Sequence, residues 1–221
     1  MSTQDQPRKR ERLNDILKQS PIVAVITIDN VAAAVPLARA LVAGGVRALE
    51  MTLRTPVAAA AATAIAKDVP DALLGVGTIL TPDDLTTARK VGAHFGVSPG
   101  ITLPLLDAAA QSDLPFLPGI ATASELIEAQ IRGFDVVKLF PASSIGMAAA
   151  RAFAGPFPKM RFCPTGGVDE GNFTEWLALP NVAAIGGSWL ARKADIDGGN
   201  WSLITENARR AMARVARPAK S

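Results

Sequence analysis

The sequence predicts an α/β fold of the (β/α)8 TIM-barrel class with an extra N-terminal helix. Eight short apolar runs start about 21–26 residues apart, the length of one strand–helix unit with short loops. The runs are continuously apolar, as expected of parallel strands that are covered on both faces. The segments between the runs begin with helix-start signals. The same alternation also permits an open doubly wound sheet, which is the alternative fold.

The expected strands follow the apolar runs in chain order. A helix over residues 8–19 is expected to precede them, and the barrel is expected to span residues 21–217. No linker or composition break divides the chain, so residues 1–221 are interpreted as one domain. The runs begin near Val23, Arg47, Leu73, His94, Pro115, Val136, Arg161 and Val182.

Helix-start signals support the segments between the strands. Thr55-Pro56 places a hydroxyl before a proline, and Thr81-Pro82 repeats the pattern with two acids behind it. Thr122 and Glu125 have the spacing of a capping box. Pro36 fits badly, because it lies inside the first main helix and is expected to kink it.

The composition limits the classes of function. Aromatic residues make up 5% of the chain and there is no Tyr, so aliphatic side chains must fill the core. The net charge of +3 is too small to indicate nucleic-acid binding. One cysteine and one histidine exclude a disulfide framework and a His-rich metal site. No uninterrupted apolar stretch or signal core is present, so a cytoplasmic protein without membrane contact is expected.

A buried lysine is the sharpest candidate for chemistry. Barrel enzymes carry their active sites at the carboxyl ends of the strands, and Lys138 stands there in the apolar run VVKLF. An apolar environment destabilises an ammonium and favours the neutral amine, which attacks carbonyl groups to form a Schiff base. An edge-strand lysine that reaches water is the structural alternative, and that alternative is favoured when the strand is considered alone.

Polar residues after the second and third strands strengthen the catalytic interpretation. Glu50 ends the second run, where partial burial suits a carboxyl group to proton transfer. Arg54 follows in the loop and can hold a carboxylate with its planar fork. Thr78 follows the third run and can donate to the same carboxylate. The structural alternatives are an ion pair for Glu50, a surface role for Arg54 and a helix cap for Thr78.

Two glycine-bearing loops follow the last two strands. They contain Thr165, Gly166 and Gly167, and then Gly186, Gly187 and Ser188. Phosphate groups often bind there in barrels, on backbone N–H groups that no side chain covers. Tight turns are the structural alternative. Because both loops stand where phosphate is expected, the phosphate interpretation is preferred.

Several further residues are expected to be structural. The basic run at Arg8, Lys9, Arg10 and Arg12 is interpreted as a solvated helix start. His94 and Asp135 lie at the strand starts, opposite the expected site. Cys163 is interpreted as a core residue. The tryptophans are expected only to pack, and they are Trp176, Trp189 and Trp201.

Taken together, the motifs resemble those of the 2-keto-3-deoxy-6-phosphogluconate (KDPG) aldolase family. They occur in family order between Pro21 and about Leu190, and the ordered set is far more specific than any single motif. The matching stretches are PIVAVI, ALVAGGVRALEMTLRTP, GVGTIL, SPG, PFLPGIATASE, VKLFPA, AGPFPKMRFCPTGG and IGGSWL.

The resemblance implies a class I aldolase that needs no metal or other cofactor and assembles as a homotrimer. Lys138 matches the Schiff-base lysine and Glu50 the general acid/base. Arg54 and Thr78 match residues that bind the pyruvate carboxylate. Thr165 matches a residue tied to stereoselectivity. Pro99 and Phe140 match residues that shape the pyruvate pocket, and the matches to the phosphate site are Gly166, Gly167, Gly187 and Ser188.

The implied reaction is the reversible cleavage of KDPG to pyruvate and glyceraldehyde 3-phosphate in the Entner–Doudoroff route. A competing hypothesis is a different aldolase specificity, for 4-hydroxy-2-oxoglutarate or for the galactonate epimer of the same substrate. A non-catalytic phosphosugar-binding barrel and a phosphosugar isomerase are hypotheses from different functional classes. A covalent imine distinguishes the aldolase from the binding protein.

Overall fold

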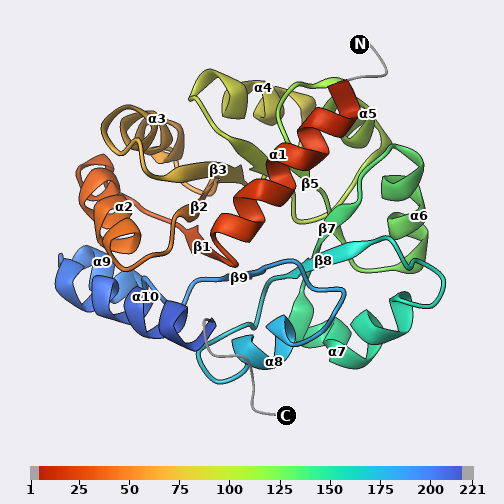
Figure 1. The fold of residues 1–221 in the computed structure, drawn as a ribbon. Helices are drawn as coiled ribbons and strands as arrows, with labels where there is room; N and C mark the ends of the chain where they lie inside the picture. The colour runs from red at the N-terminus through yellow and green to blue at the C-terminus, as the bar shows by residue number, and fades with distance from the viewer. Residues whose placement is uncertain (1–4, 216–221) are drawn as a thin grey trace.

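The computed structural model describes residues 5–215 as curled parallel sheets surrounded by helices (Figure 1). One sheet has six strands in the order β5-β4-β3-β2-β1-β9, and the other has three in the order β6-β7-β8. The predicted α/β class with a parallel sheet is therefore confirmed. The strands are β1 (Ile22–Ile26), β2 (Ala48–Thr52), β3 (Leu73–Gly77), β4 (Phe95–Val97), β5 (Phe116–Leu117), β6 (Gly119–Ile120), β7 (Val136–Leu139), β8 (Arg161–Pro164) and β9 (Ile185–Gly187).

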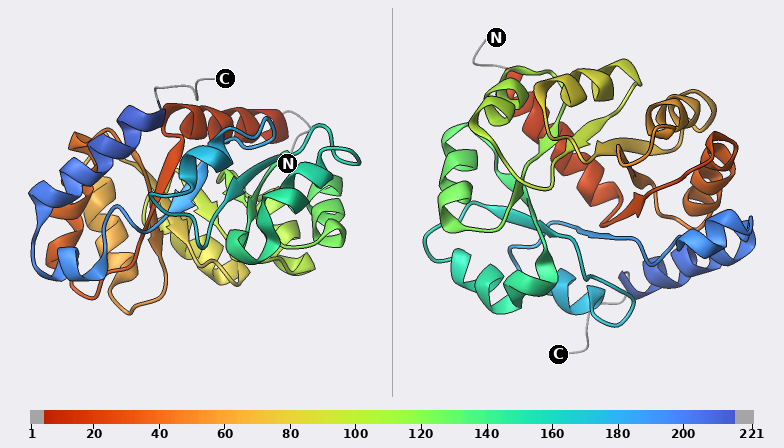
Figure 2. Two further views of the ribbon diagram at one scale, coloured as in Figure 1. Left: turned by 90° about the horizontal axis from the view of Figure 1, so that it is seen from below. Right: turned by 180° about the vertical axis from the view of Figure 1, so that it is seen from behind.

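Helices follow most strands and lie outside them (Figures 1 and 2). The N-terminal helix begins three residues earlier than predicted, and the last helix ends at Val215, so residues 216 and 217 of the predicted barrel lie outside the described residues. The helices are α1 (Asp5–Gln19), η1 (Val31–Ala33), α2 (Ala34–Ala43), α3 (Ala58–Asp68), α4 (Pro82–Lys90), α5 (Leu103–Gln111), α6 (Ala123–Ile131), α7 (Ala142–Phe153), α8 (Phe173–Leu177), α9 (Lys193–Asp197) and α10 (Trp201–Val215).

Two apolar runs form shorter strands than predicted. The run at Pro115 becomes β5 and β6 with Pro118 between them, and the two pieces are assigned to different sheets. Proline has no N–H to give to a ladder, although the Pro118 carbonyl still accepts from Lys138 N at 2.8 Å. The run at Val182 forms a strand only from Ile185, and Val182 itself makes an isolated parallel bridge with Phe162.

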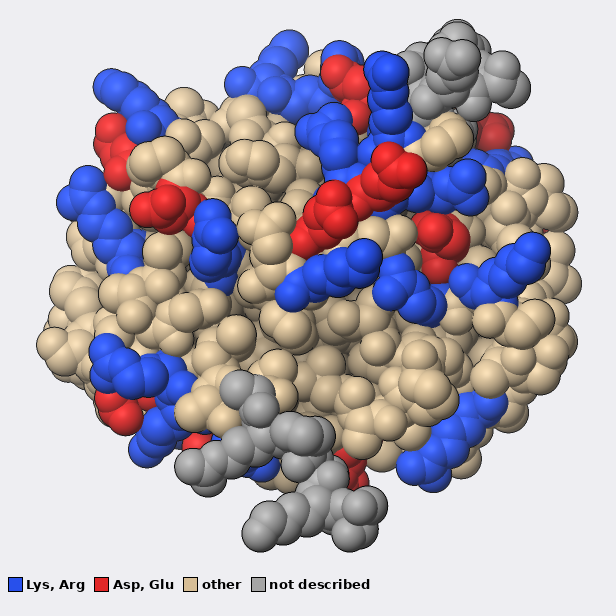
Figure 3. Space-filling view, viewed as in Figure 1, with Lys and Arg blue, Asp and Glu red and all other residues tan. Residues whose placement is uncertain are grey.

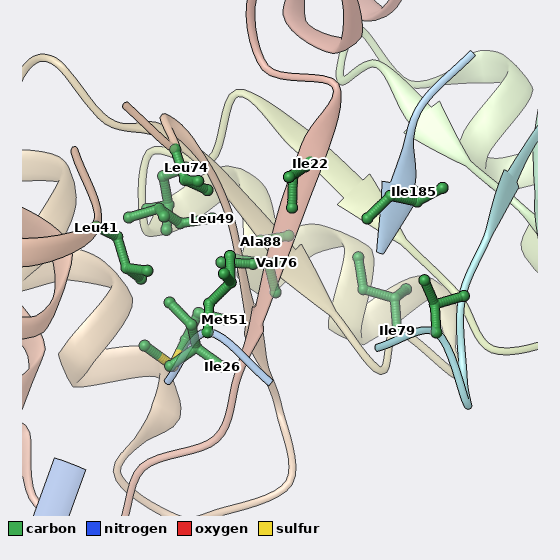
Figure 4. Close-up of a cluster of buried hydrophobic side chains, with 14 of the residues drawn as sticks. Ile22, Ile26, Leu41, Leu49, Met51, Leu74, Val76, Ile79, Ala88 and Ile185 are labelled. Atoms are coloured by element: carbon green, nitrogen blue, oxygen red, sulfur yellow. The ribbon is translucent and has the colours of Figure 1, made fainter. Parts of the chain in front are cut away.

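Alternation along the strands separates two apolar clusters. The outer cluster packs the sheets against the helices and includes Ile22, Ile26, Leu49 and Met51 (Figure 4). The residues between them point to the concave face, because successive side chains of a strand lie on opposite sides. There the inner cluster gathers, built from Leu13, Ile16, Leu17, Val23, Ala48, Phe95, Val97, Leu117, Val136, Cys163 and Ala184.

Helix α1 covers the end of the sheets where the strands begin. Figure 1 shows it crossing in front of them, and its Leu13, Ile16 and Leu17 belong to the inner cluster. This end is therefore filled with apolar side chains. Any open cavity on the concave face must lie toward the other end, where the strands finish. Within residues 5–215, no helix is long and apolar enough to cross a membrane.

Two of the predicted helix caps are confirmed and one is wrong. Thr81 and Thr122 each form a capping box, with Asp84 and Glu125 respectively. The hydroxyl of Thr55 instead donates to the carbonyl of Ile28 at 2.7 Å, and α3 begins after Val57 without a side-chain cap. The loops after β1 and β2 are tied together by this bond.

The predicted kink at Pro36 is also wrong. Helix α2 begins at Ala34, after the 3-10 turn η1, so Pro36 lies in the first turn. A backbone N–H has no intrahelical partner in the first turn, and a proline there costs no hydrogen bond.

The basic run in α1 is only partly a solvated surface. Figure 3 shows basic and acidic side chains intermingled on this face, and Arg8 is exposed. Lys9, in contrast, is buried, and its Nζ donates to the carbonyls of Ala110 at 2.7 Å and Ser112 at 2.6 Å. A cation at the carboxyl end of α5 satisfies carbonyls that have no partner within the helix. Lys9 thus attaches α1 to α5, which the sequence prediction missed.

We expect Lys9→Met to lower the free energy of unfolding by about 1–3 kcal/mol, because it leaves buried carbonyls without their donor. Arg8→Met is the matched control and is expected to change that free energy by less than about 0.5 kcal/mol. Urea unfolding followed by circular dichroism measures both. Equal effects of the two substitutions would contradict the anchoring role of Lys9.

Candidate active site

A buried lysine and a buried glutamate face each other at the upper edge of the inner cluster. Lys138 follows Val136 by two residues on β7, and Glu50 follows Ala48 by two on β2, so both continue the concave face. Lys138 Nζ lies 3.1 Å from Glu50 Oε1 and 3.4 Å from Oε2. Each side chain is 3% exposed. The strand period therefore brings together two groups that are 88 residues apart in the chain.

The pair has the same net charge before and after a proton passes between its members. An ammonium with a carboxylate and an amine with a carboxylic acid are both neutral overall. Proton transfer along the 3.1 Å contact therefore leaves no unpaired charge in a buried site, where such a charge is costly. The amine released in this way is a nucleophile, and the carboxyl group is a proton donor in the same place.

A glycine on β3 makes room for the carboxylate. A Cβ atom on Gly77 would lie 2.2 Å from Glu50 Oε1, which is far inside van der Waals contact. In the β2–β3 ladder Gly75 stands opposite Glu50 and Gly77 opposite Thr52, so Gly77 is the next inward position after the partner of Glu50. Gly77 belongs to the stretch GVGTIL and directly precedes Thr78, a predicted site residue. That position could have identified Gly77 as part of the site.

Arg54 and Thr78 are held together beside the pair. Arg54 Nε donates to Thr78 Oγ1 at 3.1 Å. Thr78 has a φ of 60°, a left-handed conformation that is unfavourable for a β-branched residue. Such a conformation costs about 1–3 kcal/mol and persists where the surroundings hold it. The arrangement leaves the two terminal nitrogens of the Arg54 guanidinium available to a carboxylate ligand.

A cavity of about 570 Å³ opens from this pair toward the ends of β8 and β9. Lys138, Phe140 and Arg54 line it, and so do the loop residues Thr165, Gly166, Gly167, Gly187 and Ser188. Arg54, predicted to bind the carboxylate end of a substrate, and the residues predicted to bind its phosphate end thus line the same cavity. The Lys138 nitrogen lies 5.3 Å from the centre of the Phe140 ring, which faces the same space.

The two glycine loops line the cavity. Gly166 and Gly167 have φ values of 86° and 78°, which L side chains rarely adopt. A Cβ on Gly167 would also lie 2.4 Å from the Cβ of Ser143. Glycine is therefore needed here both for the backbone conformation and for the contact with Ser143. Backbone N–H groups in loops of this kind are suited to an oxyanion.

Thr165 holds its hydroxyl in a fixed direction. Its Oγ1 donates to the carbonyl of Cys163 at 3.2 Å, so the oxygen lone pairs remain to accept a bond from a ligand hydroxyl. Gly186 lies opposite Thr165 through an isolated parallel bridge, and a Cβ there would meet that oxygen at 2.4 Å.

Some predicted site residues lie outside the cavity wall. Pro99 is not among its lining residues; its carbonyl carbon lies 2.4 Å from where a Cβ of Gly119 would stand, so it abuts β6. Glu50 and Thr78 likewise lie behind Lys138 and Arg54. His94 precedes β4, where its Nδ1 accepts from Leu74 N at 3.1 Å, as expected of a structural residue.

The structure adds residues to the cavity that sequence reasoning missed. Trp189, expected only to pack, lines the cavity and stacks on Phe173 with ring centres 5.5 Å apart. Thr27, at the end of the first apolar run, lines it too. Asp169 and Arg192 complete its charged wall. Each follows a strand end or a glycine loop, and that position was the signal available in the sequence.

Comparison with known proteins gives one consistent result. The profile of the KDPG and KHG aldolase family matches residues 13–207. The KHG/KDPG aldolase of Escherichia coli K12 is 48% identical over 198 residues, which are 89% of this chain and 93% of that one. The 2-dehydro-3-deoxy-phosphogluconate aldolase of Pseudomonas aeruginosa is 45% identical over 210 residues, covering 95% and 96% of the two chains.

Solved structures agree with the sequence relatives. The KDPG aldolase of Legionella pneumophila, with pyruvate captured as a covalent carbinolamine intermediate, superposes with a TM-score of 0.87 at 44% identity, covering 89% of this chain and 96% of that one. The 2-keto-3-deoxy-6-phosphogluconate aldolase of Zymomonas mobilis with 3-phosphoglycerate gives 0.85 at 38% identity, covering 92% and 96%.

The single cysteine is not available as a nucleophile. Burial raises the pKa of the Cys163 thiol to about 12. At pH 8 the thiolate fraction is on the order of one in ten thousand. We expect iodoacetamide to leave the native protein unlabelled at pH 8 and to label it promptly in urea, as mass spectrometry would record. Rapid labelling of the native protein would contradict the burial of Cys163.

Proposed function

This chain belongs to the KDPG and KHG aldolase family, and on that premise we propose how its residues divide the work. The enzyme is a class I lyase that reversibly cleaves 2-dehydro-3-deoxy-6-phosphogluconate to pyruvate and D-glyceraldehyde 3-phosphate through a Schiff base, in the Entner–Doudoroff pathway. The observation that carries the assignment of roles is the contact of 3.1 Å between Lys138 and Glu50 beside an open cavity.

Lys138 is the proposed nucleophile. Its amine adds to the C2 carbonyl carbon of the substrate, and loss of water from the carbinolamine leaves an imine. Glu50 is positioned to give and take the protons of these steps, because its carboxylate contacts Nζ. The imine, once protonated on nitrogen, withdraws electrons from C3 more strongly than the ketone does.

Glu50 is also the proposed base for bond cleavage. It removes the proton of the C4 hydroxyl, directly or through a water, and the C3–C4 electron pair moves toward the imine. The aldehyde leaves and an enamine remains on Lys138. The enamine is protonated at C3, and water then releases pyruvate and the free amine. The water consumed in hydrolysis balances the water lost when the imine formed, so the two products together contain the atoms of the substrate.

The remaining residues hold the two ends of the substrate. Arg54 and Thr78 are proposed to bind the carboxylate next to the imine, and Pro99 and Phe140 to shape the pyruvate pocket. Thr165 is proposed to accept from a substrate hydroxyl and so to select its configuration, because its own proton is already engaged. The proposed phosphate ligands are the loop residues Gly166, Gly167, Gly187 and Ser188.

A second substrate is compatible with the same site. The name of the Escherichia coli relative includes KHG, and a solved relative is a 4-hydroxy-2-oxoglutarate aldolase/2-deydro-3-deoxyphosphogluconate aldolase. 4-Hydroxy-2-oxoglutarate has the same pyruvate half as the phosphorylated substrate and carries no phosphate. Cleavage of 4-hydroxy-2-oxoglutarate is therefore the second candidate activity, and cleavage of the galactonate epimer of the phosphorylated substrate is the third.

We also propose that the two sheets form one closed (β/α)8 barrel. In support, β5 and β6 are consecutive and separated by a single proline, and isolated bridges link Phe162 to Val182 and Thr165 to Gly186. Counting β5 and β6 as one interrupted strand gives eight strands. The whole chain, residues 1–221, is then one domain built around this barrel.

The cellular setting is part of the proposal. The resemblance implies a homotrimer, and the cytoplasm is the setting expected from the sequence. The proposed partners are a small phosphorylated sugar acid, pyruvate and an aldehyde phosphate. The free, buried Cys163 is consistent with a reducing compartment. Exposed apolar side chains available for subunit contacts include Leu80, Leu103, Ile127 and Ile131.

We expect borohydride in the presence of pyruvate to add the mass of a reduced pyruvate adduct to Lys138, as peptide mass spectrometry would show. Lys193→Met is the matched control, because Lys193 lines the same cavity, and it should keep the adduct. Lys138→Met should lose it. Pyruvate that binds without any adduct would favour the non-catalytic binding protein.

We expect Glu50→Gln to lower kcat by about 10²–10⁴-fold, the usual contribution of a general acid or base, while pyruvate affinity changes far less. Steady-state kinetics and calorimetric titration with pyruvate measure the two effects. Glu128→Gln, at an exposed ion pair on α6, should leave both unchanged. Equal losses of turnover and affinity in Glu50→Gln would assign a structural role to Glu50.

A further inference from the structure

The basic side chains that line the cavity differ in whether they are already paired. Lys138 contacts Glu50, and Arg54 contacts Thr78. Lys193 is paired with Asp29 at 2.6 Å and with Asp197 at 3.0 Å. Arg192 is exposed in the cavity wall, and its guanidinium makes no hydrogen bond or ion pair with any other residue of 5–215. It is the basic group with its full donor set open to a ligand.

We propose that Arg192 is the residue that makes the enzyme selective for phosphorylated substrates. The inference rests on the proposed function and assigns a side chain to the phosphate end of the cavity. Arg192 follows Ser188 by four residues on the same loop, and both line the cavity together with Gly166 and Gly167. Its planar fork matches two oxygens of a phosphate.

The glycine loops alone are a weak basis for this selectivity. Their N–H groups are neutral donors, whereas a phosphate monoester carries a negative charge of about −1.5 to −2 at neutral pH. Asp169 adds a carboxylate to the same wall. That carboxylate accepts from Gly171 N at 2.8 Å and from Asn172 N at 3.2 Å, which offsets its charge only in part. A nearby cation strengthens the binding of a dianion at this end, and Arg192 is, among residues 5–215, the unpaired cation in the cavity wall.

A second cavity places Arg192 between two spaces. This cavity of about 230 Å³ is lined by Arg192 and Trp189, which also line the first, and by Asp195 and Arg210. Arg192 therefore lies on the wall that the two cavities share, and on the side of the first cavity formed by the loop that follows Ser188. Arg210 lines only the second cavity and donates to Asn207 at 2.7 Å, so it offers the same charge nearby without access to the substrate.

The test compares Arg192→Met with Arg210→Met as the matched control. We expect kcat/KM for 2-dehydro-3-deoxy-6-phosphogluconate to fall about 10–100-fold in Arg192→Met and less than about twofold in Arg210→Met. The exchange of the pyruvate C3 protons with D2O, followed by NMR, needs only the imine and the enamine. It should be unchanged in both variants. Arg192→Lys should recover part of the loss, because it restores the charge without the fork.

Ionic strength gives an independent readout. The wild-type kcat/KM should decrease more steeply with added salt than that of Arg192→Met, since the lost interaction is between charges. If Arg192→Met slows proton exchange as much as cleavage, the side chain has a structural role and the inference fails. If it cleaves the phosphorylated substrate as well as the wild type does, the inference also fails. A wild-type enzyme that forms no imine and cleaves nothing would instead overturn the proposed function.

Discussion

The contact between Lys138 and Glu50 is the constraint on which the site depends. Two ionisable side chains that are each 3% exposed are costly to bury singly in their charged forms, and their mutual contact offsets that cost. Because they lie on different strands, β7 and β2, the pair also requires both strands to present the same face at the same height. Gly77 is required for the same reason, since any side chain there would occupy the carboxylate's position. The proton chemistry and the packing thus impose the same geometry.

The strand period explains how one fold contains both an apolar core and a polar site. Val136 and Lys138, Ala48 and Glu50, and Cys163 and Thr165 are each separated by two residues and point to the concave face. In each of these three pairs the first residue is apolar and the second is polar. Helix α1 seals the apolar end, and Lys9 attaches this helix to α5. The polar end is left to the loops, where side chains can vary without disturbing the core.

Much of this arrangement could be predicted from the sequence. Strand starts, the capping boxes at Thr81 and Thr122, and the position of Lys138 at a strand end all follow from local patterns. What could not be predicted depends on contacts between distant segments. Thr55 was expected to cap a helix, but a carbonyl 27 residues away offers its hydroxyl a closer partner. The burial of Lys9 is likewise set by α5, about 100 residues along the chain. Thr78 was predicted to contact a ligand carboxylate, with a helix cap as the alternative. Its φ of 60° and its hydrogen bond with Arg54 could not be predicted.

In the proposed mechanism the two ends of the cavity bind a substrate in different ways, and this difference orders the release of products. The pyruvate half would be held by a covalent bond to Lys138, whereas the loops at Thr165 and Ser188, which line the same cavity, would offer only hydrogen bonds to the other half. Once the C3–C4 bond breaks, the aldehyde phosphate retains only the noncovalent contacts, while the enamine stays attached. On this mechanism the aldehyde leaves first, and hydrolysis of the imine then frees Lys138. Binding energy at the phosphate is useful in the transition state, where it orients the bond that breaks. The same binding would delay release if it became too strong, so a loop of neutral N–H groups with limited charge is better suited to turnover than a dense cluster of cations.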